Sequence, residues 1–217
     1  METGTPTYIK MLVFDDMSQC TDTEVERLLP LVSAQRREQA LKFKFTFGRF
    51  ACVKSYTMLQ QLVQEILAEA DTRWILLQQR LKEWNGDFVY NEHGKPFMRN
   101  ALGERIEGVG FSISHCRNAI AVAVGDRPVG VDVESFRHPG DALLRRTMNP
   151  DEQVQVIEAE DSAEAFTRLW TQKEAVFKLL GTGLVDNLHE VLANIDNIHL
   201  QTTVNKNRQY AYTWAMA

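Results

Sequence analysis

The chain has 217 residues, of which 44% are hydrophobic and 24% charged, with a formal net charge of −5 at pH 7. This is an ordinary globular composition, and the negative net charge gives no attraction to nucleic acid. No stretch approaches the roughly 20 apolar residues of a membrane-spanning helix, so no membrane contact is expected. The first ten residues lack a signal pattern, which predicts a cytoplasmic protein with Cys20, Cys52 and Cys116 as reduced thiols.

The first half of the chain predicts one strand followed by helices. Thr21 or Asp22 can cap the first helix and Ser33 the second, because their side-chain oxygens accept from exposed backbone N–H groups. A strand pair interrupted by the turn at Gly94–Pro96 then follows. The expected elements are a strand at 8–14, helices at 21–30, 34–43, 49–70 and 73–84, and the strand pair at 87–98.

The second half opens with three closely spaced strands, continues with helices and closes with two strands. Asn149 and Pro150 are typical of a helix start, and Gly181 and Gly183 of a helix end. Runs of strands and runs of helices predict an α+β fold. The expected elements are strands at 110–115, 119–125 and 128–134, a helix from 150, a helix at 162–180, and strands at 198–204 and 208–217.

The strand at 129–134 carries two acids on one face. Its alternation places Gly130, Asp132 and Glu134 together and the three valines opposite. Two carboxylates on one half-buried face repel each other, which predicts a positive partner between them. We expect Gly130 to leave space for a ligand beside these acids.

The helix at 162–180 places charged residues in or beside its apolar stripe. On a helical wheel Lys173 falls near the centre of the stripe, and Glu174 and Lys178 lie at its edge. A lysine in such a position needs a paired charge or an outward-reaching stem. Glu174 and Lys178 are also spaced as an ordinary surface pair.

Asp132, Glu134 and Glu174 together form a candidate magnesium site. Mg²⁺ takes oxygen ligands of this kind, and with nearby lysines it favours phosphoryl-group chemistry. A structural salt-bridge cluster is the alternative from spacing alone. His115, at a strand end after Ser114, could donate to a phosphate or could be an ordinary half-exposed residue.

Two linked motifs resemble the signature of the 4'-phosphopantetheinyl transferases. They are Gly130–Glu134 (GVDVE) and Trp170–Lys178 (WTQKEAVFK), both complete and in the family's order. His93–Pro96 (HGKP) matches a further element upstream. The length favours the large monomeric, surfactin-synthetase-activating branch. The resemblance is strong from about residue 94 to residue 183.

This resemblance implies a fold and a reaction. The fold would be a pseudo-dimer of two similar α+β halves, residues 1–103 and 104–217, with coenzyme A in the cleft between them. The enzyme would move the phosphopantetheine arm of coenzyme A to a serine of an acyl or peptidyl carrier protein and release 3',5'-ADP. It would act with Mg²⁺ and as a monomer.

The resemblance also implies roles for individual residues. The implied metal ligands are Asp132, Glu134 and Glu174; the implied catalytic residues are Glu174, Lys178 and Asp132; and the implied coenzyme A contacts are Arg36, Arg49, Lys95, Ser114, His115, Lys173 and Lys178. Glu174 would act as the base for the carrier serine, and Lys173 would lie beside the acids. Gln39 stands where the family has a second basic residue for the 3'-phosphate, which predicts weaker binding or substitution by Arg37.

Two other functions are open alternatives. One is a non-catalytic module that binds coenzyme A or a carrier protein, and the other is a magnesium-dependent pyrophosphate hydrolase. Because carrier proteins are usually acidic, Arg137, Arg145 and Arg146 are candidates for a docking patch, with a solvated surface as the alternative. Which carrier is modified does not follow from the sequence.

Overall fold

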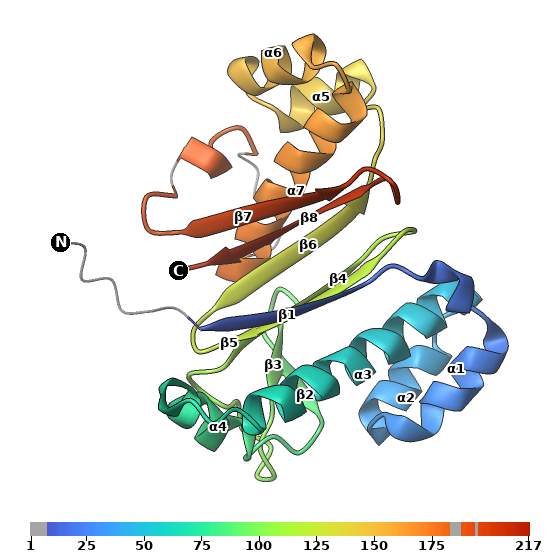
Figure 1. Ribbon diagram of the computed structural model, residues 1–217, viewed down its shortest axis with the longest axis vertical. Helices are drawn as coiled ribbons and strands as arrows, with labels where there is room; N and C mark the ends of the chain where they lie inside the picture. Colours follow the sequence, from blue (N-terminus) through green and yellow to red (C-terminus); the bar gives the residue numbers. More distant parts are fainter. Residues whose placement is uncertain (1–7, 183–187, 194) are drawn as a thin grey trace.

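A computed structural model describes residues 8–182, 188–193 and 195–217 of the chain (Figure 1). It is an α+β fold in which small antiparallel sheets are combined with helices, as the sequence predicts. In the described residues no helix is both long enough and apolar enough to cross a membrane. The division at residue 103 and the relation between two similar halves stay predictions.

Residues 8–81 form one strand followed by a layer of helices. Thr21 Oγ1 accepts from the N–H of Glu24 at the start of α1, and Ser33 Oγ accepts from the N–H of Arg36 at the start of α2, both at 3.2 Å. Both predicted caps are therefore present. The elements are β1 (Ile9–Phe14), α1 (Asp22–Leu28), α2 (Ala34–Leu41), α3 (Thr46–Leu67) and α4 (Ile75–Leu81), with 3₁₀ turns at Met17–Gln19, Leu29–Leu31 and Thr72–Trp74.

The strands form three antiparallel sheets. In the first, β5 (Ile120–Gly125) lies between β1 and β4 (Gly110–His115), and α3 covers its apolar face (Figure 1). In the second, β2 (Phe88–Tyr90) pairs with β3 (Pro96–Met98). In the third, β8 (Tyr210–Met216) lies between β6 (Val129–Ser135) and β7 (His199–Asn205). The strands β4, β5 and β6 follow one another in the chain, but β6 pairs with β8 and not with β5.

The first and third sheets are joined directly beside the candidate site. Strand β6 runs alongside β4 (Figure 1), and the backbone N–H of Val131 donates to Ser112 Oγ at 2.9 Å. A Cβ atom on Gly110 would lie 1.9 Å from the carbonyl oxygen of Arg127, so only glycine permits this close approach. The valine face of β6 packs on Ala121 and Ala123 of β5.

The helices of the second half pack on the third sheet through the last of them, α7, which lies against β6 and β8. A capping box starts α6: Asn149 Oδ1 accepts from the N–H of Glu152, and the Glu152 carboxylate accepts from the N–H of Asn149. Gly181, with φ +71°, ends α7 in the left-handed conformation. The elements are α5 (Asp141–Thr147), α6 (Pro150–Glu158), α7 (Ser162–Leu180) and a 3₁₀ turn at Val191–Ala193. The predicted stop at Gly183 lies outside the described residues.

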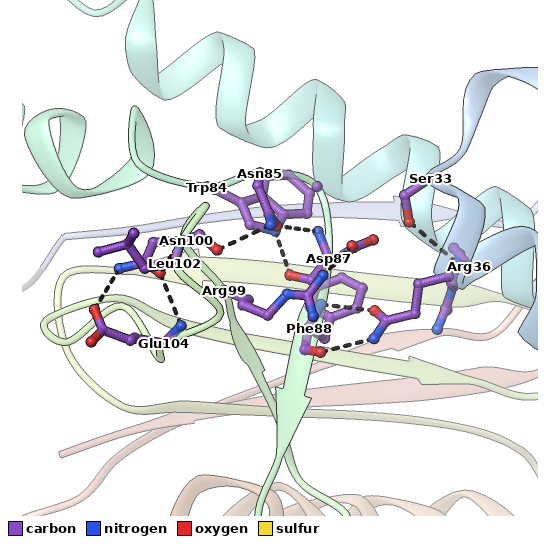
Figure 2. A network of polar contacts seen from close by, with 12 residues as sticks. Ser33, Arg36, Trp84, Asn85, Asp87, Phe88, Arg99, Asn100, Leu102 and Glu104 are labelled. Carbon is purple, nitrogen blue, oxygen red and sulfur yellow. Dashed lines mark hydrogen bonds and ion pairs between the residues drawn. The ribbon is translucent and has the colours of Figure 1, made fainter.

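The β2–β3 hairpin, which carries the Gly94–Pro96 turn, is fixed at its base. Phe88 N–H donates to Gln35 Oε1 at 2.8 Å and Gln35 Nε2 donates to Phe88 O at 2.9 Å, which ties β2 to α2. Arg99 forms an ion pair with Asp87, as Figure 2 shows. The hairpin therefore holds its turn in a set position relative to α2.

Candidate active site

One pocket of about 310 Å³ collects side chains from β4, β6 and α7. The acids of the strand, Asp132 and Glu134, meet Glu174 of the helix here, as the sequence predicts. The lining residues are Ile113, Ser114, His115, Asp132, Glu134, Trp170, Glu174 and Lys178. Three carboxylates and one lysine therefore share a single pocket.

Lys178 is the positive partner of the strand acids. Its Nζ donates to Asp132 Oδ1 at 2.6 Å and to Ser114 Oγ at 2.7 Å, and Ser114 Oγ in turn donates to Asp132 Oδ1 at 2.8 Å. The Asp132 side chain is only 4% exposed, whereas that of Lys178 is 30% exposed and borders the pocket. The three residues join α7, β6 and β4 in the wall of the pocket.

The pKa values of the two glutamates of the pocket are both raised. Burial raises the pKa of the Glu134 carboxyl and the charge of Asp132 raises it further, while the Arg137 guanidinium opposes the rise. Burial likewise raises the pKa of Glu174, again with Asp132 as the second cause. Carboxylates that share a site behave in this way because their negative charges repel. A cation or a protonated partner would relieve this repulsion.

His115 lies at the rim of the same pocket. Burial lowers the pKa of its imidazole, and the nearby Lys178 ammonium lowers it further. The neutral ring keeps one N–H that can donate to a ligand. Its ring meets that of Phe47 edge-on, with 5.7 Å between centroids.

The acids of the pocket offer the oxygen donors that a divalent cation prefers. Asp132 Oδ2 is buried and has no hydrogen-bond partner, an arrangement that costs free energy and that a bound cation would correct. Over the described ranges, no group of three or more histidine, cysteine, aspartate or glutamate side chains is arranged to hold a metal ion. The donor types therefore fit a cation, although their arrangement among the described residues is not that of a formed metal site.

Gly130 has a different role from the expected one. A Cβ atom at this position would lie 1.9 Å from the carbonyl oxygen of Ala175 and 2.5 Å from the backbone nitrogen of Leu179. The glycine therefore lets α7 approach β6 closely and leaves no space for a ligand. This close approach brings the acids of β6 and the acid of α7 to one pocket.

Lys173 is fully buried and its ammonium has three partners. It donates to Glu152 Oε2 at 2.6 Å, to Thr147 O at 2.9 Å and to Leu188 O at 2.7 Å. Lys173 lies within the apolar stripe of α7 because Glu152 of α6 neutralises its charge. The prediction that it lies beside the acids of the pocket was therefore wrong. A contact with coenzyme A stays a prediction, and the burial of the ammonium argues against it.

A second pocket, of about 260 Å³, adjoins the first. The two pockets share Ile113, Glu174 and Lys178, and the second continues toward the Gly94–Pro96 turn between Phe111 and Phe177. It combines charged groups at one end with apolar walls, as ligand pockets usually do.

Lys95 lies in the wall of this second pocket. Its Nζ donates to Leu179 O at 2.7 Å, at the end of α7. Burial lowers the pKa of Lys95 to about 8, with Arg105 as a lesser cause. Asn91 holds the turn, since its Oδ1 accepts from the N–H of Lys95 at 2.8 Å and its Nδ2 donates to Gly181 O at 3.0 Å.

Arg36 and Arg49 lie in the helical layer and line neither pocket. Arg36 donates to Cys52 O at 2.9 Å and to Gln39 Oε1 at 2.9 Å, so Gln39 is its partner. The Arg36 charge still contributes to the lowered pKa of His115, after burial and the Lys178 charge. Arg49 forms an ion pair with Asp22 at 3.0 Å.

Trp170 was not among the site residues predicted from the sequence. Trp170 lines the acidic pocket, and a hydrogen bond from its side chain lowers the pKa of Glu134. The guanidinium of Arg137 lies 5.6 Å from the Trp170 ring centroid. The available signal was the position of Trp170 one helical turn before Glu174, on the same face.

Residues 128–216 match the family model of the 4'-phosphopantetheinyl transferase superfamily. The matched span contains β6 and α7, and with them the three acids and Lys178. The match covers 89 of the 217 residues, so it shows a similarity to this superfamily over that part of the chain. The α+β fold class and the resemblance to this family, both expected from the sequence, are confirmed.

Curated relatives of this superfamily are similar to most of the chain. A 4'-phosphopantetheinyl transferase of Bacillus pumilus is 28% identical over 174 residues, which cover 79% of the chain and 67% of the relative. One of Nostoc is 31% identical over 134 residues, or 59% of the chain and 53% of the relative. The transferase Sfp of Bacillus subtilis is 22% identical over 165 residues, or 74% and 65%. The matches thus span between about half and two thirds of these phosphopantetheinyl transferases.

Proposed function

We propose that the protein transfers the 4'-phosphopantetheine arm of coenzyme A to a serine of an acyl or peptidyl carrier protein and releases 3',5'-ADP. The observation that carries this proposal is the cluster of Lys178, Ser114 and Asp132 in a pocket that also holds Glu134 and Glu174. A lysine and a hydroxyl bind phosphate oxygens, while the adjoining carboxylates suit a cation that neutralises a pyrophosphate. The names of the relatives support the same reaction.

The two adjoining pockets could hold two different phosphate-bearing parts of coenzyme A. The pyrophosphate is expected at the acidic pocket, near Lys178, Ser114 and His115. The lysine of the Gly94–Pro96 turn, Lys95, offers a second positive charge in the apolar pocket for another phosphate group. Lys178 borders both pockets and would therefore contact the substrate where the two pockets meet.

Asp132, Glu134 and Glu174 would hold the magnesium ion. The unpartnered buried oxygen of Asp132 and the raised pKa values of both glutamates are the features that favour it. When bound, the ion would offset the negative charge of the pyrophosphate and of the leaving group. Monomeric action and a cytoplasmic location stay predictions.

Side chains of the protein would remove the serine proton and stabilise the leaving group. The carrier serine oxygen forms a bond to the β-phosphorus of coenzyme A, and the phosphoanhydride bond to the α-phosphate breaks, with 3',5'-ADP as the leaving group. Glu174 takes the serine proton, directly or through water. Lys178 stabilises the negative charge that develops on the leaving phosphate.

The test is an intact-mass measurement on apo carrier proteins. Incubation of the wild-type chain with coenzyme A and Mg²⁺ should add one phosphopantetheine arm to the carrier serine. Asp132→Asn and Glu174→Gln should be folded and inactive, whereas Asp141→Asn, on α5 and outside the pocket, should remain active. Activity retained in either site variant would remove that acid from the catalytic role.

A further inference from the structure

Residues 41–45, which join α2 to α3, expose an unusual set of apolar side chains. Leu41 is 61% exposed, Phe43 is 42% exposed and Phe45 is 70% exposed. In the described ranges the other exposed large apolar residues occur singly or as pairs along the chain: Leu31, Ile75, Leu76, Tyr90, Leu102, Val154, Ile157 and Leu180. A group of three within five residues is the kind of surface that marks a binding site.

This 41–45 segment lies beside the acidic pocket. Phe47, in the first turn of α3, packs edge-on against His115 of the pocket rim. The ring of Phe43 packs on Gly48, where an added Cβ would lie 2.7 Å from Phe43 Cδ1. The segment is thus anchored to α3 through Phe43 while Leu41 and Phe45 remain open to solvent.

The 41–45 segment is also basic. Lys42 and Lys44 alternate with the apolar residues, and the ion pair of Lys42 with Glu38 is exposed on both sides, 71% and 73%. Such an exposed pair contributes little and leaves the ammonium available to a partner. The chain as a whole carries a net charge of −5, so this segment is a positively charged site on a protein that is negatively charged overall. Arg137 places a further cation beside Trp170, which lines the same pocket.

We propose that the 41–45 segment docks the acidic carrier protein whose serine enters the pocket. This inference rests on the proposed function. The lysines would face the acidic surface of the carrier, and Leu41 and Phe45 would cover an apolar patch next to the target serine. Docking at this place would bring the serine to the rim formed by His115, close to Lys178 and Glu174.

The experiment measures binding without turnover. Fluorescently labelled apo acyl carrier protein and an apo peptidyl carrier domain, each with the target serine replaced by alanine, are titrated with the full chain. Phe45→Ser and the double variant Lys42→Glu/Lys44→Glu should each bind the carrier about tenfold more weakly, as expected for a central apolar contact and for reversed charges. Coenzyme A binding, measured by calorimetry, should stay unchanged.

Matched controls lie at the far end of α3. Leu76→Ser removes a residue of α4 that is 72% exposed, and Lys82→Glu reverses an exposed charge next to α4. Because the 22 residues of α3 separate the two places by about 33 Å, both controls should bind the carrier like the wild type.

Several results would overturn the docking inference. Carrier affinity could be unchanged in both segment variants, or the wild type could have no affinity for either carrier. The variants could also weaken coenzyme A binding in place of carrier binding, or the segment could bind anionic phospholipid vesicles in place of carriers. The proposed function fails separately. A wild-type chain that binds the carrier but transfers nothing would contradict the transferase, and segment variants that transfer and bind normally would contradict only the docking site.

Discussion

The ammonium of Lys178 lies 2.6 Å from Asp132 Oδ1, while the other oxygen of the same carboxylate is buried without a partner. One oxygen of the Asp132 carboxylate is therefore neutralised by the protein, and the other is left without a partner. Ser114 adds a hydroxyl to the neutralised side. This asymmetry makes Asp132 the residue through which a lysine and a cation could act on one substrate.

Removal of the Lys178 charge should reduce transfer strongly. In Lys178→Met the group proposed to stabilise the leaving phosphate is lost, which typically lowers kcat by about 10² to 10³. Steady-state kinetics with coenzyme A and an apo carrier give the value. Undiminished kcat/KM in the methionine variant would exclude a role of this lysine in the chemical step.

Magnesium should stabilise the folded protein in the absence of any substrate. A cation that binds the folded chain alone raises Tm in proportion to the logarithm of its concentration. Thermal unfolding with and without Mg²⁺ should show this rise in the wild type and lose it in Asp132→Asn. A similar rise in both proteins would place the ion elsewhere.

Lys95 should make coenzyme A capture pH-dependent. Its pKa is lowered to about 8, so the ammonium that would attract phosphate is present below pH 8 and is lost as the pH rises. The kcat/KM for coenzyme A, which reports the free enzyme, should therefore fall between pH 7 and pH 9. In Lys95→Met the value should be lower at pH 7 and this fall should be absent.

The same lysine predicts the sign of a stability effect. Between pH 8 and its usual value of 10.5 the unfolded chain holds more protons at Lys95 than the folded chain. The contribution of Lys95 to the free energy of unfolding should therefore increase as the pH rises through this window. Urea unfolding of the wild type and Lys95→Met at pH 8 and 10 measures the difference, and an opposite sign would refute the assignment.

Removal of one partner of the Lys173–Glu152 pair should lower the free energy of unfolding, because the other charge stays buried without a partner. Lys173→Met leaves a buried carboxylate without its cation, which costs about 3–5 kcal/mol in comparable proteins. Urea unfolding should show this loss, and the double variant Lys173→Met/Glu152→Leu should recover part of it. Lys42→Met, which breaks an exposed pair with Glu38, serves as the control and should leave the midpoint unchanged. Equal midpoints for Lys173→Met and this control would contradict the pairing.

Gly130→Ala should separate α7 from β6. The added methyl group meets backbone atoms of Ala175 and Leu179, which cannot move aside alone, and overpacking of this kind costs about 1–3 kcal/mol. Transfer activity should fall as well, because Glu174 moves with α7. Gly140→Ala, where no atom lies within 4 Å, is the matched control. Equal stability of the two variants would show that the close approach is unnecessary.

Local patterns in the sequence were sufficient for most elements. The apolar periodicity and the termini of α7 predict its observed bounds, Ser162–Leu180, and the alternation in β6 predicts that Asp132 and Glu134 share a face. Helix α5 was not predicted, because it has only seven residues and its N-cap residue, Gly140, offers no side-chain cap. A short helix of this kind depends on packing against its neighbours.

Contacts between distant segments could not be predicted in the same way. A helical wheel gives the direction of Lys173 but not its partner, and Glu152 arrives from another helix. Similarly, the face of Gly130 was predicted, but not the helix packed against it. Which strand pairs with β6 is also decided by the tertiary structure, because β8 lies some 80 residues further along the chain.

The most direct test of the central claim is to count both products of one reaction. The wild-type chain is mixed with limiting apo carrier protein, excess coenzyme A and Mg²⁺, and the holo-carrier and 3',5'-ADP are quantified together over time. Transfer predicts one 3',5'-ADP for each carrier modified, with both curves ending when the apo carrier is consumed. Release of 3',5'-ADP without carrier, or with no added arm on the carrier, would contradict transfer and indicate hydrolysis.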